Sequence, residues 1–188
     1  MELASSFKFS KMNYFEFYDI PVSFLPDQNL VKKKFYAFSK AYHPDFFVNE
    51  SEEKQNEILE LSTLNNKAYQ TLSNDIKRLP YVLQVLGKLE EGEKYSLPND
   101  FLMEMMEINE ALMELEFEPD AEKLNEIRSE IKAIEDSLNQ GMETHMREFE
   151  ALQQGDKNVA LNKIKDIYFR KKYLLRIQES IDTFATRL

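Results

Sequence analysis

The chain has 188 residues, 43% of them hydrophobic, with 14 Phe and 9 Tyr, so it can build one large or two small packed domains. Its formal net charge is −10, and it has no Cys, which excludes disulfides, thiolate nucleophiles, zinc–thiolate sites and cysteine-ligated iron–sulfur clusters. Gly (4) and Pro (6) are scarce and long stretches are rich in Glu, Lys, Leu and Met, a composition that predicts an all-α fold.

Residues 1–12 show no helical periodicity, and we predict that they form a loose leader. They also lack an apolar run of the length found in signal peptides. No segment of the chain approaches the roughly 20 apolar residues of a membrane span. We therefore expect a soluble, cytoplasmic protein with no membrane partner.

Two helices, one short and one longer, are predicted after the leader. Asn13 can cap a short helix that ends before Pro21, and Asp27 can cap a longer one. Apolar side chains of the longer helix recur at i, i+4, i+7 and i+11, which places them on one face: Val31, Phe35, Phe38 and Tyr42. The opposite side carries Lys32, Lys33 and Lys40.

A proline separates this helix from the next. Pro44 cannot continue the helix and moves His43 out of the α region, so residues 43–50 are predicted to form a loop. Ser51 or Asn49 can cap the following helix, which should run to about residue 73 and pack antiparallel to the preceding one. Its apolar seam consists of Ile58, Leu61, either Leu64 or Asn65, Ala68 and Leu72.

A fourth helix is predicted from about Asn74 to Leu86, ending at Gly87, with a late start or a kink because Pro80 lies about one turn inside it. Residues 89–98 combine charge with Gly and Pro and are predicted to be a linker between two domains, 13–88 and 99–188. Three helical stretches follow, at roughly 99–117, 119–153 and 156–186, with Pro119 at a first helical position. Their short connections predict an antiparallel three-helix bundle.

The residue patterns of common enzyme sites are missing. Neither His43 nor His145 follows a Glu by three residues, as a di-iron bundle site requires. The glycines stand alone, so no phosphate-binding loop is present, and two distant histidines make neither a metal site nor a nucleophile relay. We expect a protein that is not an enzyme and has no metal or cofactor, with His145 as an ordinary surface residue.

The triplet His43-Pro44-Asp45 gains meaning from its context. It lies in FSKAYHPDFF, is followed by a long helix ending in NNKAYQTLSN and then by IKRLPYVLQVLG. Over residues 13–88 this order and spacing resemble a J domain, an antiparallel helical hairpin with short flanking helices. From Tyr14 onward the chain is similar to the HscB-type co-chaperones of iron–sulfur cluster assembly.

The resemblance implies a chaperone-binding surface. Residues His43, Pro44 and Asp45, with the basic face formed by Lys32, Lys33 and Lys40, would dock an ATP-driven chaperone of the HscA/DnaK type and stimulate its ATPase. A positive face of this kind suits an acidic partner. One departure concerns Phe46, because a basic or polar residue commonly follows the triplet.

Acidic residues dominate the helix at 99–117 and its flanks. Residues 90–122 include 12 acidic side chains and one lysine, Lys94, which disfavours nucleic-acid binding. One stripe of this helix should pack in the bundle: Phe101, Met105, Ile108, Leu112 and Leu115. Leu102, Met106 and Met113 form a second apolar strip, beside which lie Met103, Glu107, Glu110 and Glu114. This strip either packs against another helix or docks a partner.

The family resemblance favours docking. FLMEMMEINEAL looks like the segment with which HscB-type proteins hold the iron–sulfur scaffold protein, which is IscU-like. The implied scaffold-binding residues are Leu102, Met103, Met106, Glu107, Glu110 and Phe169. The expected function is a co-chaperone that delivers this scaffold to its chaperone. Two alternatives stay open: a general J-domain folding co-chaperone with another client, and a non-chaperone helical adaptor in which the triplet is accidental.

Overall fold

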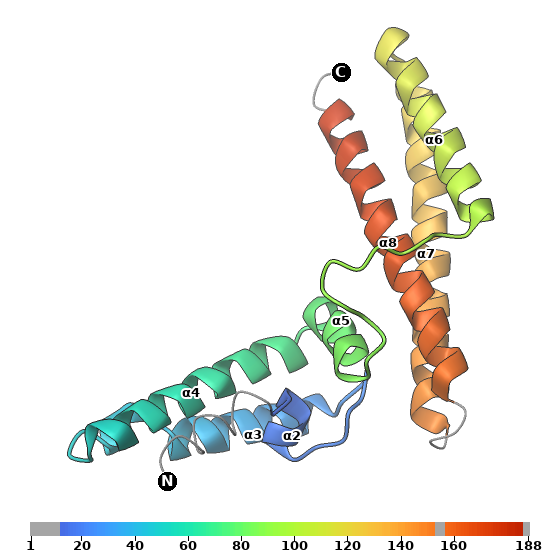
Figure 1. Ribbon diagram of the computed structural model, residues 1–188. Coiled ribbons are helices and arrows are strands. Elements are labelled where there is room, and N and C mark those ends of the chain that lie inside the picture. Colours follow the sequence, from blue (N-terminus) through green and yellow to red (C-terminus); the bar gives the residue numbers. More distant parts are fainter. Residues whose placement is uncertain (1–11, 153–156, 186–188) are drawn as a thin grey trace. The chain divides into compact units, whose positions relative to one another are not determined.

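The computed structural model describes residues 12–152 and 157–185, so the predicted leader lies almost wholly outside the described residues. Every regular element of the described chain is helical (Figure 1). By contacts the chain divides into two compact units, residues 1–87 and 88–188. The elements are α2 (Tyr14–Tyr18), α3 (Gln28–Ala41), the 3₁₀ helix η1 (Pro44–Phe46), α4 (Glu52–Leu72), α5 (Asp75–Val85), α6 (Asn99–Phe117), α7 (Ala121–Ala151) and α8 (Lys157–Ala185). The all-α prediction is confirmed.

The centre of the N-terminal unit is the antiparallel hairpin of α3 and α4 (Figure 1). Gln28, at the start of α3, donates a hydrogen bond to the carbonyl of Leu72, at the end of α4. Farther along, Asn65 Nδ2 donates to the carbonyl of Phe35 (3.1 Å) and to Ser39 Oγ (3.0 Å). Of the two residues that the periodicity left open, Asn65 is therefore the buried one, because its amide has partners on α3.

Side-chain caps fix where the helices of this unit begin. Asn13 Oδ1 accepts the backbone N–H groups of Phe15 and Glu16, and Asp27 and Ser51 cap α3 and α4 in the same way. Of the two possible caps for α4, Ser51 is the one used. The predicted loop at 43–50 contains the short η1 turn, because Pro44 supplies a φ angle suited to a first helical position.

Aromatic side chains join α2 to the rest of the unit. Phe15, Tyr18 and Phe24 are fully or almost fully buried, and the hydroxyl of Tyr18 donates to Asn65 Oδ1 at 2.9 Å. The Tyr81 hydroxyl, on α5, accepts the backbone N–H of Tyr14 at 2.7 Å, and the two rings stack with centroids 4.6 Å apart. Both ends of the short α2 are thus anchored.

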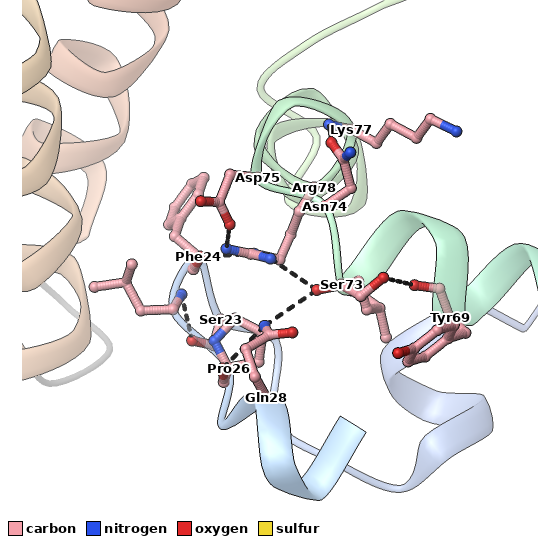
Figure 2. A network of polar contacts seen from close by, with 12 residues as sticks. Ser23, Phe24, Pro26, Gln28, Tyr69, Ser73, Asn74, Asp75, Lys77 and Arg78 are labelled. Atoms are coloured by element: carbon pink, nitrogen blue, oxygen red, sulfur yellow. Dashed lines mark hydrogen bonds and ion pairs between the residues drawn. The ribbon is translucent and has the colours of Figure 1, made fainter. Parts of the chain in front are cut away.

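A buried arginine links α5 to two other segments. Arg78 donates hydrogen bonds to the carbonyls of Phe24 (2.9 Å) and Leu72 (2.7 Å) and forms an ion pair with Asp75. Figure 2 shows Arg78 beside Phe24 and Asp75. The Leu72 carbonyl belongs to the last turn of α4, where a cation is favourable. This arrangement fixes α5 against the end of the hairpin.

The predicted start of α5 at about Asn74 is confirmed, whereas the predicted start of α7 at Pro119 is wrong. Helix α5 begins at Asp75 and is capped by Asn74, so Pro80 does not delay its start. Because proline has no N–H, the carbonyl of Ile76, four residues earlier, loses its helical hydrogen-bond partner. The side chain of Ile76 is exposed, so water can reach this part of the helix. Helix α7 begins at Ala121 and not at Pro119, because the side chain of Asp120 accepts the N–H groups of Glu122 and Lys123 and so becomes the cap.

The C-terminal unit is the predicted three-helix bundle. The predicted stripe of α6 is buried, and it packs with apolar side chains of α7 and α8: Leu124, Ile127, Ile131, Leu174, Ile177 and Ile181. At Gly141 of α7, a Cβ atom would lie 3.3 Å from Ile167 Cδ1 of α8, so glycine permits a close approach of these two helices. His145, predicted to be an ordinary surface residue, is half-buried, and its Nδ1 lies 2.7 Å from a carboxylate oxygen of Glu148.

The segment predicted as a linker, 89–98, is held against the bundle over part of its length. Glu93 forms an ion pair with Lys165 of α8, and the Tyr95 hydroxyl donates to Asp166 Oδ1 at 2.9 Å. Leu97 packs against the apolar core of the bundle. These contacts attach residues 93–97 to α8.

Candidate partner-binding surfaces

The corner between α3 and α4 displays the His43-Pro44-Asp45 triplet to solvent. His43 has an extended backbone (φ −74°, ψ 122°), and its Nδ1 accepts the backbone N–H of Asp45 at 3.3 Å. The side chains of His43 and Asp45 are 51% and 82% exposed. A second molecule could therefore reach both the imidazole and the carboxylate.

Hydrogen bonds hold the corner against α4. The side-chain amide of Gln55 donates to the carbonyls of Val48 (3.2 Å) and Glu50 (3.0 Å), and Ser51 caps the helix directly after the loop. Side chains on a loop held in this way are already positioned for a partner, which lowers the entropy lost on binding.

The described residues contain no group of three or more His, Asp or Glu side chains placed to hold a metal ion.

A basic face lies beside the corner. Lys32, Lys33 and Lys40 are all exposed on α3, and none of them forms an ion pair within the described parts of the chain. Their charges are therefore available to an acidic partner. Phe46 is also exposed, and its ring lies 5.5 Å from that of His43, so the triplet is bordered by an apolar side chain.

The second surface is the outward side of α6. Leu102, Met103 and Met106 are 38%, 64% and 60% exposed, whereas the intervening Met105 is fully buried. The sequence leaves two possibilities for the strip of Leu102, Met106 and Met113: packing against another helix, or docking a partner. The exposure of Met106 and Met113, each 60%, favours docking, because no helix of the bundle's described part covers them. The strip is thus available to a partner.

Acidic side chains lie next to this strip. Glu107 and Glu110 are exposed and have no ion-pair partner among the described residues. Glu114 differs, because Lys123 Nζ donates to its carboxylate at 2.6 Å and so lowers the pKa of Glu114. A partner would therefore meet free carboxylates mainly at Glu107 and Glu110.

Phe169, the remaining predicted scaffold contact, is half-buried. Its ring stacks on that of Tyr95 with centroids 4.5 Å apart and an interplanar angle of 4°, so one face is covered. Burial, and then the hydrogen bond to Asp166, raise the pKa of Tyr95. Tyr95 escaped the sequence prediction because the contact joins residues more than 70 positions apart and leaves no periodic signal.

Phe117, at the end of α6, was also missed. It follows Met113 by one helical turn and lies on the same strip, and it is the most exposed large apolar side chain of the bundle's described part. The i, i+4 spacing from Met113 was the signal that could have revealed it.

No helix among the described residues is long and apolar enough to cross a membrane.

A family model described as the HSCB C-terminal oligomerisation domain matches residues 97–182. The chain is 30% identical over 178 residues to the iron-sulfur cluster co-chaperone protein HscB of Mus musculus, covering 94% of this chain and 70% of the mouse protein. It is 29% identical over 174 residues to the co-chaperone protein HscB homolog of Colwellia psychrerythraea, covering 92% and 98% of the two chains.

The fold of the chain is also similar to that of a solved HscB structure. The crystal structure of human co-chaperone protein HscB superposes on this chain with a TM-score of 0.64 at 27% identity, covering 95% of this chain and 84% of the human one. The similarity thus extends over both units. The chain belongs to the HscB family of co-chaperones.

Proposed function

We propose that this protein stimulates the ATPase of an HscA/DnaK-type chaperone and delivers an IscU-like iron–sulfur scaffold protein to it. The observation that carries the proposal is the exposure of His43, Pro44 and Asp45 at a fastened corner, in a chain that also presents an uncovered apolar strip. The name of its mouse relative, which refers to iron–sulfur clusters, supports the choice of client. The protein itself would not be the catalyst.

The chaperone contact would combine the corner with the basic face. Lys32, Lys33 and Lys40 would attract an acidic surface of the chaperone and raise the association rate, an effect that weakens with salt. The triplet would then form the short-range hydrogen bonds, because His43 and Asp45 offer a donor and an acceptor on a preformed turn. ATP hydrolysis would take place on the chaperone.

The scaffold contact would use the outward side of α6. Leu102, Met103 and Met106 would bury their apolar side chains against the scaffold, and methionine adapts well to an irregular surface. Glu107 and Glu110 would pair with basic groups at the edge of the contact. Phe169 would contribute the part of its ring that Tyr95 leaves uncovered.

Carrying both contacts on one chain has a thermodynamic consequence. Once the scaffold is bound to the C-terminal unit, its encounter with the chaperone becomes intramolecular, which raises the effective concentration of the client without any additional contact. This is the physical meaning that we attach to delivery.

Replacing Leu102, Met103 and Met106 together with serine tests the scaffold contact. The proposal predicts that scaffold binding, measured by titration calorimetry, is lost while the helical content stays unchanged, since the three side chains are exposed. Leu175→Ser, at a half-exposed position on α8, is the matched control and should bind normally. Retained binding by the triple variant would show that the bundle holds the scaffold elsewhere or carries another client.

Replacing His43 with glutamine tests the chaperone contact. Stimulation of ATP turnover by a cognate chaperone should disappear, and scaffold binding should persist because His43 belongs to the other unit. His145→Gln is the matched control, since it removes the second histidine of the chain, which belongs to the C-terminal unit. Equal stimulation by the His43 variant would support the adaptor alternative.

A further inference from the structure

The exposed strip of α6 is longer than the predicted scaffold site. Met113 and Phe117 continue the line of Leu102 and Met106 and are 60% and 87% exposed. At about 100° per residue, these four side chains fall within a sector of about 60° that contains no charged residue. The strip formed by Leu102, Met106, Met113 and Phe117 is about 22 Å long, since a helix rises about 1.5 Å per residue.

The part of the predicted site that lies on α6 is too small for a stable interface. Residues 102–110 span only about 12 Å of helix. A specific protein–protein interface of standard size covers about 800 Å² on each partner, a patch roughly 30 Å across. A contact centred on Leu102 and Met106 therefore needs area beyond these residues and Phe169, and the uncovered apolar side chains on the same side of α6 are Met113 and Phe117.

We propose that Met113 and Phe117 are further contact residues for the scaffold protein, so that the partner lies along the whole of α6. The inference rests on the proposed function and extends its binding site by two turns. It also defines the partner surface: an apolar ridge about 20 Å long, with basic groups along the edge that faces Glu107 and Glu110.

Charge decides between this partner and a second copy of the chain. Residues 90–122 carry 12 acidic side chains and one lysine, so two copies meeting through α6 would bring acidic borders together. Like charges at an interface are costly, whereas a partner with a basic border would be attracted. The strip is therefore suited to a different protein.

The test compares the two halves of the strip in the full-length protein. Met113→Gln with Phe117→Gln, and separately Leu102→Gln with Met106→Gln, replace apolar side chains with an uncharged helix-forming residue. Titration calorimetry against the scaffold protein should show a Kd about tenfold weaker, or more, for each pair. Val159→Gln with Leu175→Gln, two exposed apolar positions on α8, is the matched control and should leave the Kd unchanged.

The outcomes separate this inference from the proposed function. If the Leu102 and Met106 pair weakens binding but the Met113 and Phe117 pair does not, the extension is overturned and the proposed function stands. If the unaltered protein does not bind the scaffold, the proposed function fails first. Sedimentation velocity is run on the same variants, and loss of a dimer on changing Met113 and Phe117 would assign the strip to self-association and overturn the inference.

Discussion

Arg78 donates its Nε–H to the backbone carbonyl of Phe24, 54 residues earlier in the chain, at 2.9 Å. The same guanidinium reaches the carbonyl of Leu72, and the side chain is 5% exposed, the only charged one among the buried residues of the described chain. One cation thus holds together the segment before α3, the end of α4 and the start of α5 (Figure 2). The stability of the N-terminal unit should depend on it.

Arg78→Met tests this dependence. Methionine preserves much of the apolar stem but removes the two hydrogen bonds that Arg78 donates to the Phe24 and Leu72 carbonyls, so we expect a loss of about 3 kcal/mol in the free energy of unfolding. Hydrogen exchange of peptides from α3 to α5 at increasing urea measures the effect in this unit alone. Lys77→Met, on the exposed side of the same helix, is the control. Similar losses for both variants would contradict the role of Arg78.

Alkaline pH should weaken the N-terminal unit. Burial raises the pKa of Tyr81 from 10.0 to about 12, and burial also raises the pKa of Tyr18. A pKa raised in the folded state favours the protonated hydroxyl, so this stabilisation is complete below pH 10 and is lost as the pH rises from 10 toward about 12. The free energy of unfolding, measured across this range, should fall.

Tyr81→Phe separates this effect from general alkaline damage. The variant should be less stable at neutral pH, because the Tyr14 N–H loses its acceptor, and its stability should decline less steeply above pH 10. Tyr36→Phe, at an exposed position of α3, is the matched control. An unchanged slope in the Tyr81 variant would assign the pH dependence to other groups.

Oxidation should distinguish the two faces of α6. Met103, Met106 and Met113 are each at least 60% exposed, whereas Met105 is fully buried between them. Dilute hydrogen peroxide, which transfers one oxygen atom to the thioether and is reduced to water, should therefore convert the three exposed methionines first. Peptide mass spectrometry measures the order. Oxidation of Met105 at the same rate would mean that α6 does not pack as described.

Helix positions followed from periodicity and capping residues, because both are local. Asn13 and Asp27 begin their helices as predicted, Ser51 is the cap used of the two predicted for α4, and the buried stripe of α6 is confirmed. Local signals could not choose between Leu64 and Asn65, since the amide becomes tolerable in the core only when Tyr18, Phe35 and Ser39 supply partners from elsewhere in the chain. Arg78 escaped prediction for the same reason.

The candidate sites depended on family resemblance more than on pattern. Periodicity alone left the strip of Leu102 and Met106 open to a neighbouring helix, and only the folded bundle shows that no helix of its described part covers Met106. The exposure of the triplet followed from Pro44, which forces a corner between two packed helices. The covering of Phe169 by Tyr95 could not be predicted, because it depends on how residues 93–97 return to α8. The partner assignments stay predictions.

The most direct test of the account is steady-state ATP turnover by a cognate HscA-like chaperone, with this protein and the iron–sulfur scaffold added singly and together. Two contacts on one chain predict that the pair stimulates turnover by more than the sum of the separate effects. The excess should vanish when Leu102, Met103 and Met106 are changed to serine, although stimulation by the protein alone should persist. Strictly additive stimulation would contradict scaffold delivery, and no stimulation by the unaltered protein would contradict the central claim.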